Sequence, residues 1–307
     1  MENLCHFVCS RGLLKSCTFH SQNPKSSCGT NTKYLNNMVK QNKLQNGHSI
    51  YVCSELLPFF VKDILPKMNK QFVLVTGDSD LNVPREVLNL KQYEALINNK
   101  FLNKWFAQNT QMYMCDKICQ LPIGLDYHTI SADPVHKWLD KDNKDKEGHL
   151  PKDQEYILLN LRQNMIPFQE RINKIYVNFT LSKSNDRFKQ RENALKQIPN
   201  QLMIQNLTFT KRTENWQNTI KYTFVLSPFG NGMDCHRTWE ALCLGCIPIV
   251  KAPNFKQLFE NLPVLNVNEW TDITQELLDN TIQEFQNRQF NYEKLTLKYW
   301  TNQINHL

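Results

Sequence analysis

Glycine and proline are scarce in this sequence, and no long apolar run is present. The 307 residues include 9 glycines and 13 prolines, which excludes a collagen-like repeat and a broadly disordered chain. No apolar stretch approaches the roughly 20 residues that a membrane-spanning helix needs. The N-terminal segment contains Cys, His and Arg where a signal peptide has an uninterrupted apolar core. We therefore expect a soluble, cytoplasmic protein without an integral membrane segment.

Paired cysteine spacings and clusters of basic residues are also missing. The 10 cysteines never form the two short, paired spacings of a zinc module, so we expect free thiols in a reducing compartment and no bound metal. The net charge of +7 is spread thinly along the chain, without the clustered basic and stacking aromatic residues that favour nucleic-acid binding. The sequence predicts no nucleic-acid partner, and its charge supplies only a weak favourable field for a phosphate-bearing ligand.

The length and the order of the apolar segments indicate two α/β domains. A chain of 307 residues suits two hydrophobic cores with a ligand-binding cleft between them. Residues 1–48 show no sustained period, and we expect a loosely ordered leader there. Strands and helices then alternate, as in parallel sheets, in an N-terminal domain at 49–150 and a C-terminal domain at 151–285. The charged stretch 132–151 is the expected linker, and residues 286–307 are expected to form a helix that packs back across the domains.

The N-terminal domain illustrates the expected alternation. Residues 49–53 and the apolar run 71–77 are expected strands. Residues 86–99 and 103–109 are expected helices, and residues 117–129 are expected to form a strand that runs into a loop.

The segment from Tyr222 to Lys251 carries the most informative pattern. An apolar strand is followed by a glycine-containing loop at 230–232, an N-cap candidate at Asp234 and a helix that stops at Gly245. Glycines let backbone amides approach an anion closely, and the first helical turn adds unpaired N–H groups and the positive end of the helix dipole. A strand, loop and helix of this kind suit a pyrophosphate.

Two charged residues on this helix sharpen the prediction. Arg237 falls in the first turn, where a guanidinium can donate paired hydrogen bonds to phosphate oxygens. Glu240 lies three residues later on the same face, where a carboxylate can accept hydrogen bonds from ribose hydroxyls. Spacing alone also permits a structural interpretation, in which Asp234 is only an N-cap, the glycines only make a turn, and Arg237 and Glu240 form a surface ion pair.

Residues 227–250, SPFGNGMDCHRTWEALCLGCIPIV, resemble the C-terminal signature of exostosin-type glycosyltransferases. The resemblance implies two facing Rossmann-like domains, a GT-B-type fold, with the nucleotide on the C-terminal domain and the acceptor side on the N-terminal domain. It implies transfer of a hexosyl or glycuronosyl group from a nucleotide sugar, such as a UDP-sugar, to a hydroxyl of a glycan or glycoprotein. Inversion at the anomeric carbon and independence of metals or other cofactors are also implied. The donor-binding set would be Ser227, Gly230, Asn231, Gly232, Asp234, Arg237 and Glu240.

The N-terminal half resembles a variant group related to the exostosins. The resemblance lies in the segments VTGDSD, KWFAQN and LPIGLDYHT. Because the chain lacks the membrane anchor of the animal enzymes that make heparan sulfate, it does not support their Golgi setting or their glycosaminoglycan acceptor.

Candidates for the catalytic base come from the N-terminal domain. Asp78 and Asp80 follow an apolar strand, and His128 follows another expected strand, so each is a candidate base. A capped turn and a structural histidine are the alternatives. On another transferase fold, Asp78 and Asp80 would instead hold a divalent metal through the donor phosphates. Candidates for additional phosphate contacts are Arg187, Arg191 and Arg212.

A non-catalytic protein on the same fold is the alternative from a different functional class. Such a module would bind a nucleotide or a glycan without turnover, because a fold alone does not specify an activity. Arg237 and Glu240 predict donor binding whether the protein is a transferase or a non-catalytic module.

Overall fold

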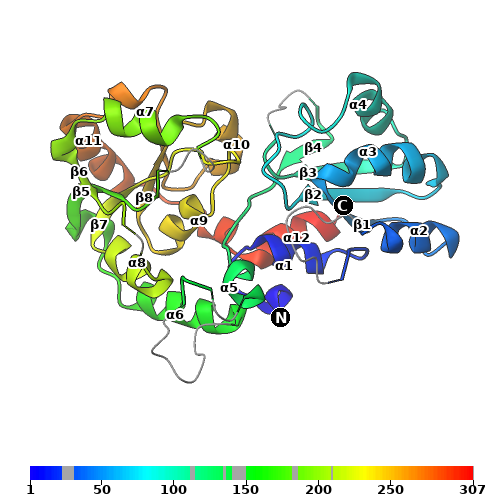
Figure 1. Ribbon diagram of the computed structural model, residues 1–307, viewed down its shortest axis with the longest axis horizontal. Coiled ribbons are helices and arrows are strands. Elements are labelled where there is room, and N and C mark those ends of the chain that lie inside the picture. Colours follow the sequence, from blue (N-terminus) through cyan, green and yellow to red (C-terminus); the bar gives the residue numbers. More distant parts are fainter. Residues whose placement is uncertain are drawn as a thin grey trace.

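Two parallel β-sheets, each accompanied by helices, make up the molecule in the computed structural model (Figure 1). The structure describes residues 1–22, 31–110, 115–133, 136–139, 150–181, 186–208 and 210–306. The first sheet has the order β1-β2-β3-β4, and its neighbouring strands are parallel. Its strands are β1 (His48–Cys53), β2 (Phe72–Gly77), β3 (Leu102–Ala107) and β4 (Ile118–Gln120). The predicted α/β class with two parallel sheets is confirmed.

The second sheet has the order β6-β5-β7-β8-β9 and is also parallel. Because β6 and β7 lie on opposite sides of β5, the strand order reverses there. The carboxyl ends of β5 and β7 therefore flank a topological switch point, where ligands bind in open parallel sheets. The strands are β5 (Ile172–Val177), β6 (Met203–Gln205), β7 (Tyr222–Leu226), β8 (Ile247–Val250) and β9 (Leu265–Asn266).

Helices follow most strands along the chain. In the N-terminal half they are α1 (Ser10–Ser16), α2 (Lys33–Lys40), α3 (Leu57–Phe59), α4 (Leu90–Ile97) and α5 (His128–Ala132). Short helical turns η2 (Ser54–Leu56), η3 (Phe60–Ile64) and η4 (Leu65–Lys67) flank α3. The later helices are α6 (Pro151–Gln163), α7 (Gln190–Gln197), α8 (Arg212–Thr219), α9 (His236–Cys243), α10 (Lys256–Phe259), α11 (Gln275–Gln286) and α12 (Leu297–Asn305). In the part of the chain that the structure describes, no helix is long and apolar enough to cross a membrane.

The leader at residues 1–48 is packed into the molecule, which corrects the expectation of a loosely ordered segment. Within its described residues, α1 buries Leu13 and Leu14. Phe7 forms an isolated bridge with Thr296, and Cys9 forms one with Gly124. These partners lie far away in the sequence, so the segment has no local apolar period that would have indicated its order.

In the segment 103–109, residues 103–107 form a strand and 108–109 a turn, in place of the expected helix. The strand forms most of β3, which pairs with β2 on one side and β4 on the other. Trp105, Phe106 and Ala107 are all buried there. Long-range pairing decides this conformation, because a run of seven residues is too short for its periodicity to separate a buried strand from a buried helix.

The C-terminal helix lies against the opposite end of the chain. Helix α12 packs on α1 and contacts β1 and β2 (Figure 1). Helix α6 begins at Pro151, the end of the expected linker, of which residues 134–135 and 140–149 lie outside the described residues.

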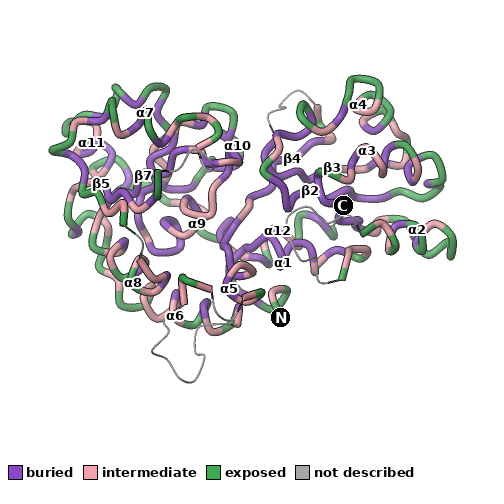
Figure 2. Tube along the Cα trace, viewed as in Figure 1, coloured by how far each residue is buried: buried purple, intermediate pink, exposed green. Residues whose placement is uncertain are grey.

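One of the hydrophobic cores is shared by the two sheets. It includes Val73 and Val75 of β2 together with Val225 of β7 and Trp239 of α9. Two further clusters each lie within one half of the chain. The strands of both halves are largely buried, whereas the exposed residues gather on the outer helices and turns (Figure 2). The shared core therefore packs the two sheets' halves of the chain against each other.

Candidate functional site

A cleft of about 500 Å³ opens beside the carboxyl ends of β5, β6 and β7. The segment 178–180 after β5 and the loop 230–232 after β7 line it, which places the cleft at the switch point of the second sheet. Asp80, Ile123 and Asp126 line it from the N-terminal half. The predicted cleft between two α/β halves is therefore present, and it faces the predicted glycine loop.

The glycine loop turns tightly against the N-terminal half. The amide of Gly230 donates to the carbonyl of Gly232 across 3.2 Å. A Cβ on Gly232 would lie 3.1 Å from Asn109 Nδ2 and 3.3 Å from Asp80 Oδ1. Glycine therefore lets this loop and its neighbours from the first sheet approach each other at the cleft. Asn231, the middle residue of the loop, lines the cleft and hydrogen bonds to Asp80.

Two arginines meet at the cleft over one aromatic ring. The guanidinium carbon of Arg237 lies 5.0 Å from the ring centroid of Phe179, and that of Arg191 lies 5.6 Å from it. Arg191 Nη1 donates to the carbonyl of Thr180 at 3.1 Å, whereas Arg191 Nε and Arg237 Nη1 have no hydrogen-bond partner among the described residues. Burial, followed by the charge of Arg191, lowers the pKa of Arg237 to about 10. Two guanidinium groups therefore lie near one ring, each with a buried donor that no described residue satisfies.

Glu240 lines the same cleft one helical turn after Arg237. No ion pair joins Arg237 to Glu240 among the ion pairs of the described chain, although the carboxylate acts on the guanidinium at longer range. The structural alternative of a surface ion pair therefore does not describe these two residues. Both side chains remain available to a ligand.

Ser227 and Asp234 are used for packing, which corrects their expected roles. Ser227 is 2% exposed, lies outside the cleft lining, and exchanges a 2.8 Å hydrogen bond with Thr238. Asp234 borders the cleft, but its carboxylate accepts from the amide of Ile123 at 2.7 Å and from Trp239 Nε1 at 2.9 Å. It is not the N-cap of α9 either, because Cys235 occupies that position. These bonds connect α9 to the first sheet and leave little acceptor capacity for a ligand.

The two aspartates of the acidic turn face different surroundings. Asp78 Oδ2 accepts from Arg11 at 2.8 Å, and Asp78 is not among the residues that line the cleft. Burial raises the pKa of Asp78 to about 6, although Arg11 acts against the shift. Asp80 lines the cleft, and burial raises its pKa while His236 and the hydrogen bond with Asn231 oppose the rise. Asp80 is therefore the member of the pair that can meet a ligand.

Two of the three additional arginines are committed to other partners. Arg187 forms an ion pair with Glu86 of the N-terminal half and is not part of the cleft lining. Arg212 is buried, donates to Gln154 Oε1 at 2.7 Å and to the carbonyl of Asp126, and lies 5.0 Å from the ring of Trp138. Arg212 lines the cleft and also holds Asp126 through that carbonyl, and Arg191 lines the cleft as described.

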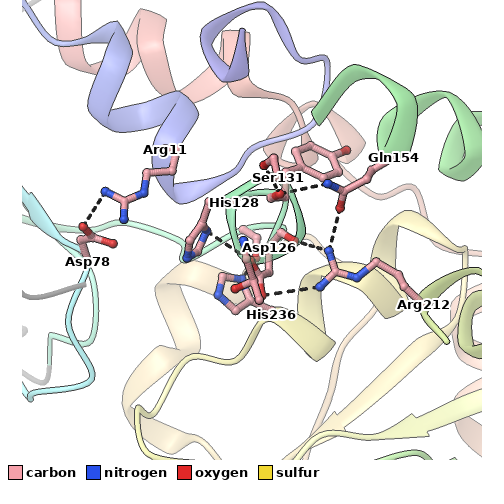
Figure 3. A network of polar contacts seen from close by, with 11 residues as sticks. Arg11, Asp78, Asp126, His128, Ser131, Gln154, Arg212 and His236 are labelled. Carbon is pink, nitrogen blue, oxygen red and sulfur yellow. Dashed lines mark hydrogen bonds and ion pairs between the residues drawn. The ribbon is translucent and has the colours of Figure 1, made fainter. Parts of the chain in front are cut away.

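His128 belongs to a polar network that includes Asp126 and Arg212 (Figure 3). Its Nδ1 lies 3.1 Å from Asp126 Oδ1, and its ring centroid lies 6.1 Å from that of His236. Burial lowers the pKa of His128 to about 4, against the opposing charge of Asp126. His128 is not among the residues that line the cleft, whereas Asp126 and His236 are.

Sequence reasoning assigned no site role to Phe179, Asp126 or His236. The position of Phe179 directly after β5 was an available signal, because the carboxyl end of a parallel strand is where ligand contacts collect. Asp126 and His236 had no such signal, since they meet only through the packing of α9 against the loop before α5. That packing is visible in the 2.7 Å contact between His236 Nδ1 and the carbonyl of Gly124.

The fold is similar to that of a protein of solved structure. No family model matches the chain, and no curated protein matches it. Among solved structures, the crystal structure of Anabaena Alr3699/HepE in complex with UDP is similar, with a TM-score of 0.41 and 13% sequence identity. The match covers 94% of this chain and 81% of that one.

Proposed function

We propose that this protein is a glycosyltransferase that takes a nucleotide sugar in the cleft and transfers its sugar to a hydroxyl acceptor. The observation that carries the proposal is the pair Arg191 and Arg237, stacked over Phe179 at the switch point with unsatisfied donors. A diphosphate is the ligand class that suits two adjacent guanidinium groups beside a glycine loop. The exostosin-type signature at 227–250 supports the same assignment.

Each ligand group has a candidate partner in the cleft. The diphosphate lies between the two arginines and the loop 230–232, and Glu240 accepts hydrogen bonds from the ribose. Asp80 and Asp126 border the opposite side, where the acceptor enters. The developing charge on the leaving diphosphate is stabilised by the arginines and by backbone N–H groups at the start of α9. The reaction is inverting and independent of metals, on a GT-B-type fold, and the acceptor is a hydroxyl of a glycan or glycoprotein.

Calorimetric titration of UDP and uridine tests the binding half of the proposal. Arg237→Lys keeps the charge but loses the planar fork, so it weakens UDP more than uridine. Glu240→Gln replaces a charged acceptor by a neutral amide and weakens both ligands, by about 1.5–3 kcal/mol or roughly ten- to a hundredfold in Kd. Two matched controls lie at exposed positions: Glu276→Gln in α11 and Arg288→Lys just after it. We expect both controls to leave the affinities for UDP and uridine unchanged. If all variants bind UDP, GDP and ADP as tightly as wild type, the donor site does not lie on this helix.

Release of nucleoside diphosphate from a panel of nucleotide sugars tests the catalytic half. Wild-type protein turns over at least one donor, and both binding and turnover survive EDTA because the arginines replace a cation. Loss of both on chelation, restored by Mn²⁺, would favour a metal-dependent transferase in which Asp80 contributes a ligand. Tight UDP binding without turnover of any donor would favour the non-catalytic module.

Cytoplasmic location is part of the proposal. The nine cysteines among the described residues are free thiols, and most of them are buried. Free thiols are typical of a reducing compartment.

A further inference from the structure

His236 is held at the cleft by one ring nitrogen, and the other nitrogen takes no part in that contact. Its Nδ1 lies 2.7 Å from the carbonyl oxygen of Gly124. A carbonyl oxygen only accepts hydrogen bonds, so Nδ1 carries the proton and Nε2 of the neutral ring carries the lone pair. His236 also lines the cleft. The contact with Gly124 therefore fixes the tautomer that a general base requires.

A buried carboxylate lies behind this imidazole. Asp126 is 7% exposed, its Oδ1 accepts from the amide of Thr129 at 3.0 Å, and its Oδ2 lies 3.5 Å from Arg212 Nη2. Burial alone would raise the pKa of Asp126, but His236, His128 and Arg212 together hold it well below its usual value. Asp126 therefore carries a negative charge beside the ring of His236 (Figure 3).

His236 and Arg237 are consecutive residues in the first turn of α9. Consecutive side chains on an α-helix point about 100° apart, so the two groups diverge from one backbone position. Arg237 reaches the ring of Phe179 on the second-sheet side, while His236 turns toward the loop at Gly124 on the other side. A donor whose diphosphate binds Arg237 places its sugar near His236 and Asp80, both of which line the cleft.

We propose that Nε2 of His236 is the general base of the transfer, with Asp126 as a positioning residue that stabilises the resulting imidazolium. This inference rests on the proposed function. Nε2 takes the proton of the acceptor hydroxyl as the acceptor oxygen forms a bond to the anomeric carbon. The bond from that carbon to the diphosphate oxygen breaks, and the leaving nucleoside diphosphate keeps the electron pair. The proton on His236 then passes to solvent.

His236→Asn tests the proposal with a minimal change. Asn presents an amide N–H close to the position of Nδ1, so it keeps the donor to Gly124 and removes Nε2. Release of UDP from UDP-glucose, UDP-galactose and UDP-N-acetylglucosamine is measured with water and with a panel of free sugars as acceptors. Loss of a general base lowers kcat by about 10²–10⁴-fold, while the Kd of UDP and the thermal midpoint stay at wild-type values. His306→Asn, at an exposed histidine, is the control and keeps full activity.

The pH profile gives a readout that a structural role would not move. In wild type, kcat falls at low pH as Nε2 becomes protonated, and in His236→Asn the residual rate loses this limb. The titratable groups that face His236 are Asp78, Asp80, Asp126, Asp234 and His128. Because Asp80 is a titratable group that also lines the cleft, Asp80→Asn is measured beside wild type. We expect its kcat to show the same fall at low pH.

The possible failures are distinguishable. Wild-type activity in His236→Asn, or loss of the low-pH limb in Asp80→Asn instead, would overturn the role of His236 and leave the transferase assignment intact. A wild-type protein that binds no nucleoside diphosphate, or that binds UDP and releases none from any donor, would overturn the proposed function itself. Loss of UDP binding in His236→Asn would make the residue a donor contact and not the base.

Discussion

Asp234 illustrates how a single side chain connects the two halves of the molecule. Its carboxylate bonds to Ile123 from the first half and to Trp239 of its own helix, and its amide donates to Asn109 Oδ1 at 2.9 Å. Asn109 Nδ2 in turn donates to the carbonyl of Ser79 at 2.9 Å. Burial raises the pKa of Asp234 to about 6, although the bonds from Ile123 and Trp239 act against the rise. The carboxyl of Asp234 is therefore ionised at neutral pH, and because it is buried this ionisation lowers the stability of the folded state.

This raised pKa predicts a pH dependence of stability. The unfolded carboxyl has the usual pKa of 3.8 and the folded one a pKa of about 6, so between these pH values only the folded carboxyl binds a proton. Its contribution to the free energy of unfolding therefore increases as the pH falls and is lost as the pH rises through about 6. Asp234→Asn removes this titration. We expect the free energy of unfolding of wild type, relative to that of the variant, to grow by about 2 kcal/mol between pH 7 and pH 4. Urea unfolding of both proteins at several pH values measures it, and parallel curves would contradict it.

At the scale of elements, helix α6 fixes the N-terminal segment to the body of the molecule. Glu155 accepts from the amide of His6 at 2.8 Å and from that of Phe7 at 2.9 Å. On its other side the segment exchanges backbone hydrogen bonds with the C-terminal region, where Val8 donates to Leu295 at 2.8 Å. Residues 6–8 therefore lie between α6 and the turn before α12, and this accounts for the burial of Phe7 and Val8.

Glu155→Gln tests the contribution of that anchor. The amide offers one acceptor oxygen in place of two, and its NH₂ group meets a backbone N–H that it cannot satisfy. We expect a loss of about 2–4 kcal/mol in the free energy of unfolding, since hydrogen bonds to a buried charge are involved. Glu94→Gln, in an exposed position of α4, changes it by less than about 0.5 kcal/mol. Equal urea midpoints for the two variants would show that the segment is held by apolar packing alone.

At the scale of the whole molecule, the two sheets share one hydrophobic core. Polar bonds cross the same boundary, since Gln120 Oε1 accepts from the amide of Leu258 at 3.1 Å and Asp234 binds Ile123. Neither half has a fully separate interior, because α12 from the end of the chain packs against the first sheet. The walls of the cleft therefore belong to two halves that share a hydrophobic core and are joined by polar bonds.

We accordingly predict a single cooperative unfolding transition. Loss of either half would expose the core residues of the other, so neither remains folded alone. In differential scanning calorimetry, the calorimetric and van't Hoff enthalpies should agree within the error of the measurement. UDP should move the single transition upward without splitting it, because a ligand that binds only the folded state stabilises all of it. Two resolved peaks, with only one shifted by UDP, would contradict this prediction.

The local pattern of the sequence determined the α/β class and the main features of the second half. The run from Tyr222 to Lys251 predicts a strand, a glycine loop and a helix, and β7, the loop and α9 are present in that order. Strand periodicity, glycine and helix-stop signals act over a few residues, so they are readable without tertiary contacts. The same locality placed Arg237 and Glu240 on one helix face.

The tertiary structure alone decided the rest. It made 103–107 a strand, buried the leader, turned Ser227 and Asp234 into packing residues, and separated Asp78 from Asp80. It also brought Arg191 beside Arg237, and Asp126 beside His236, across long stretches of chain. In each case the deciding contact joins residues distant in sequence, and the free energy of burial or pairing at such a contact outweighs the short-range preferences that a sequence pattern records.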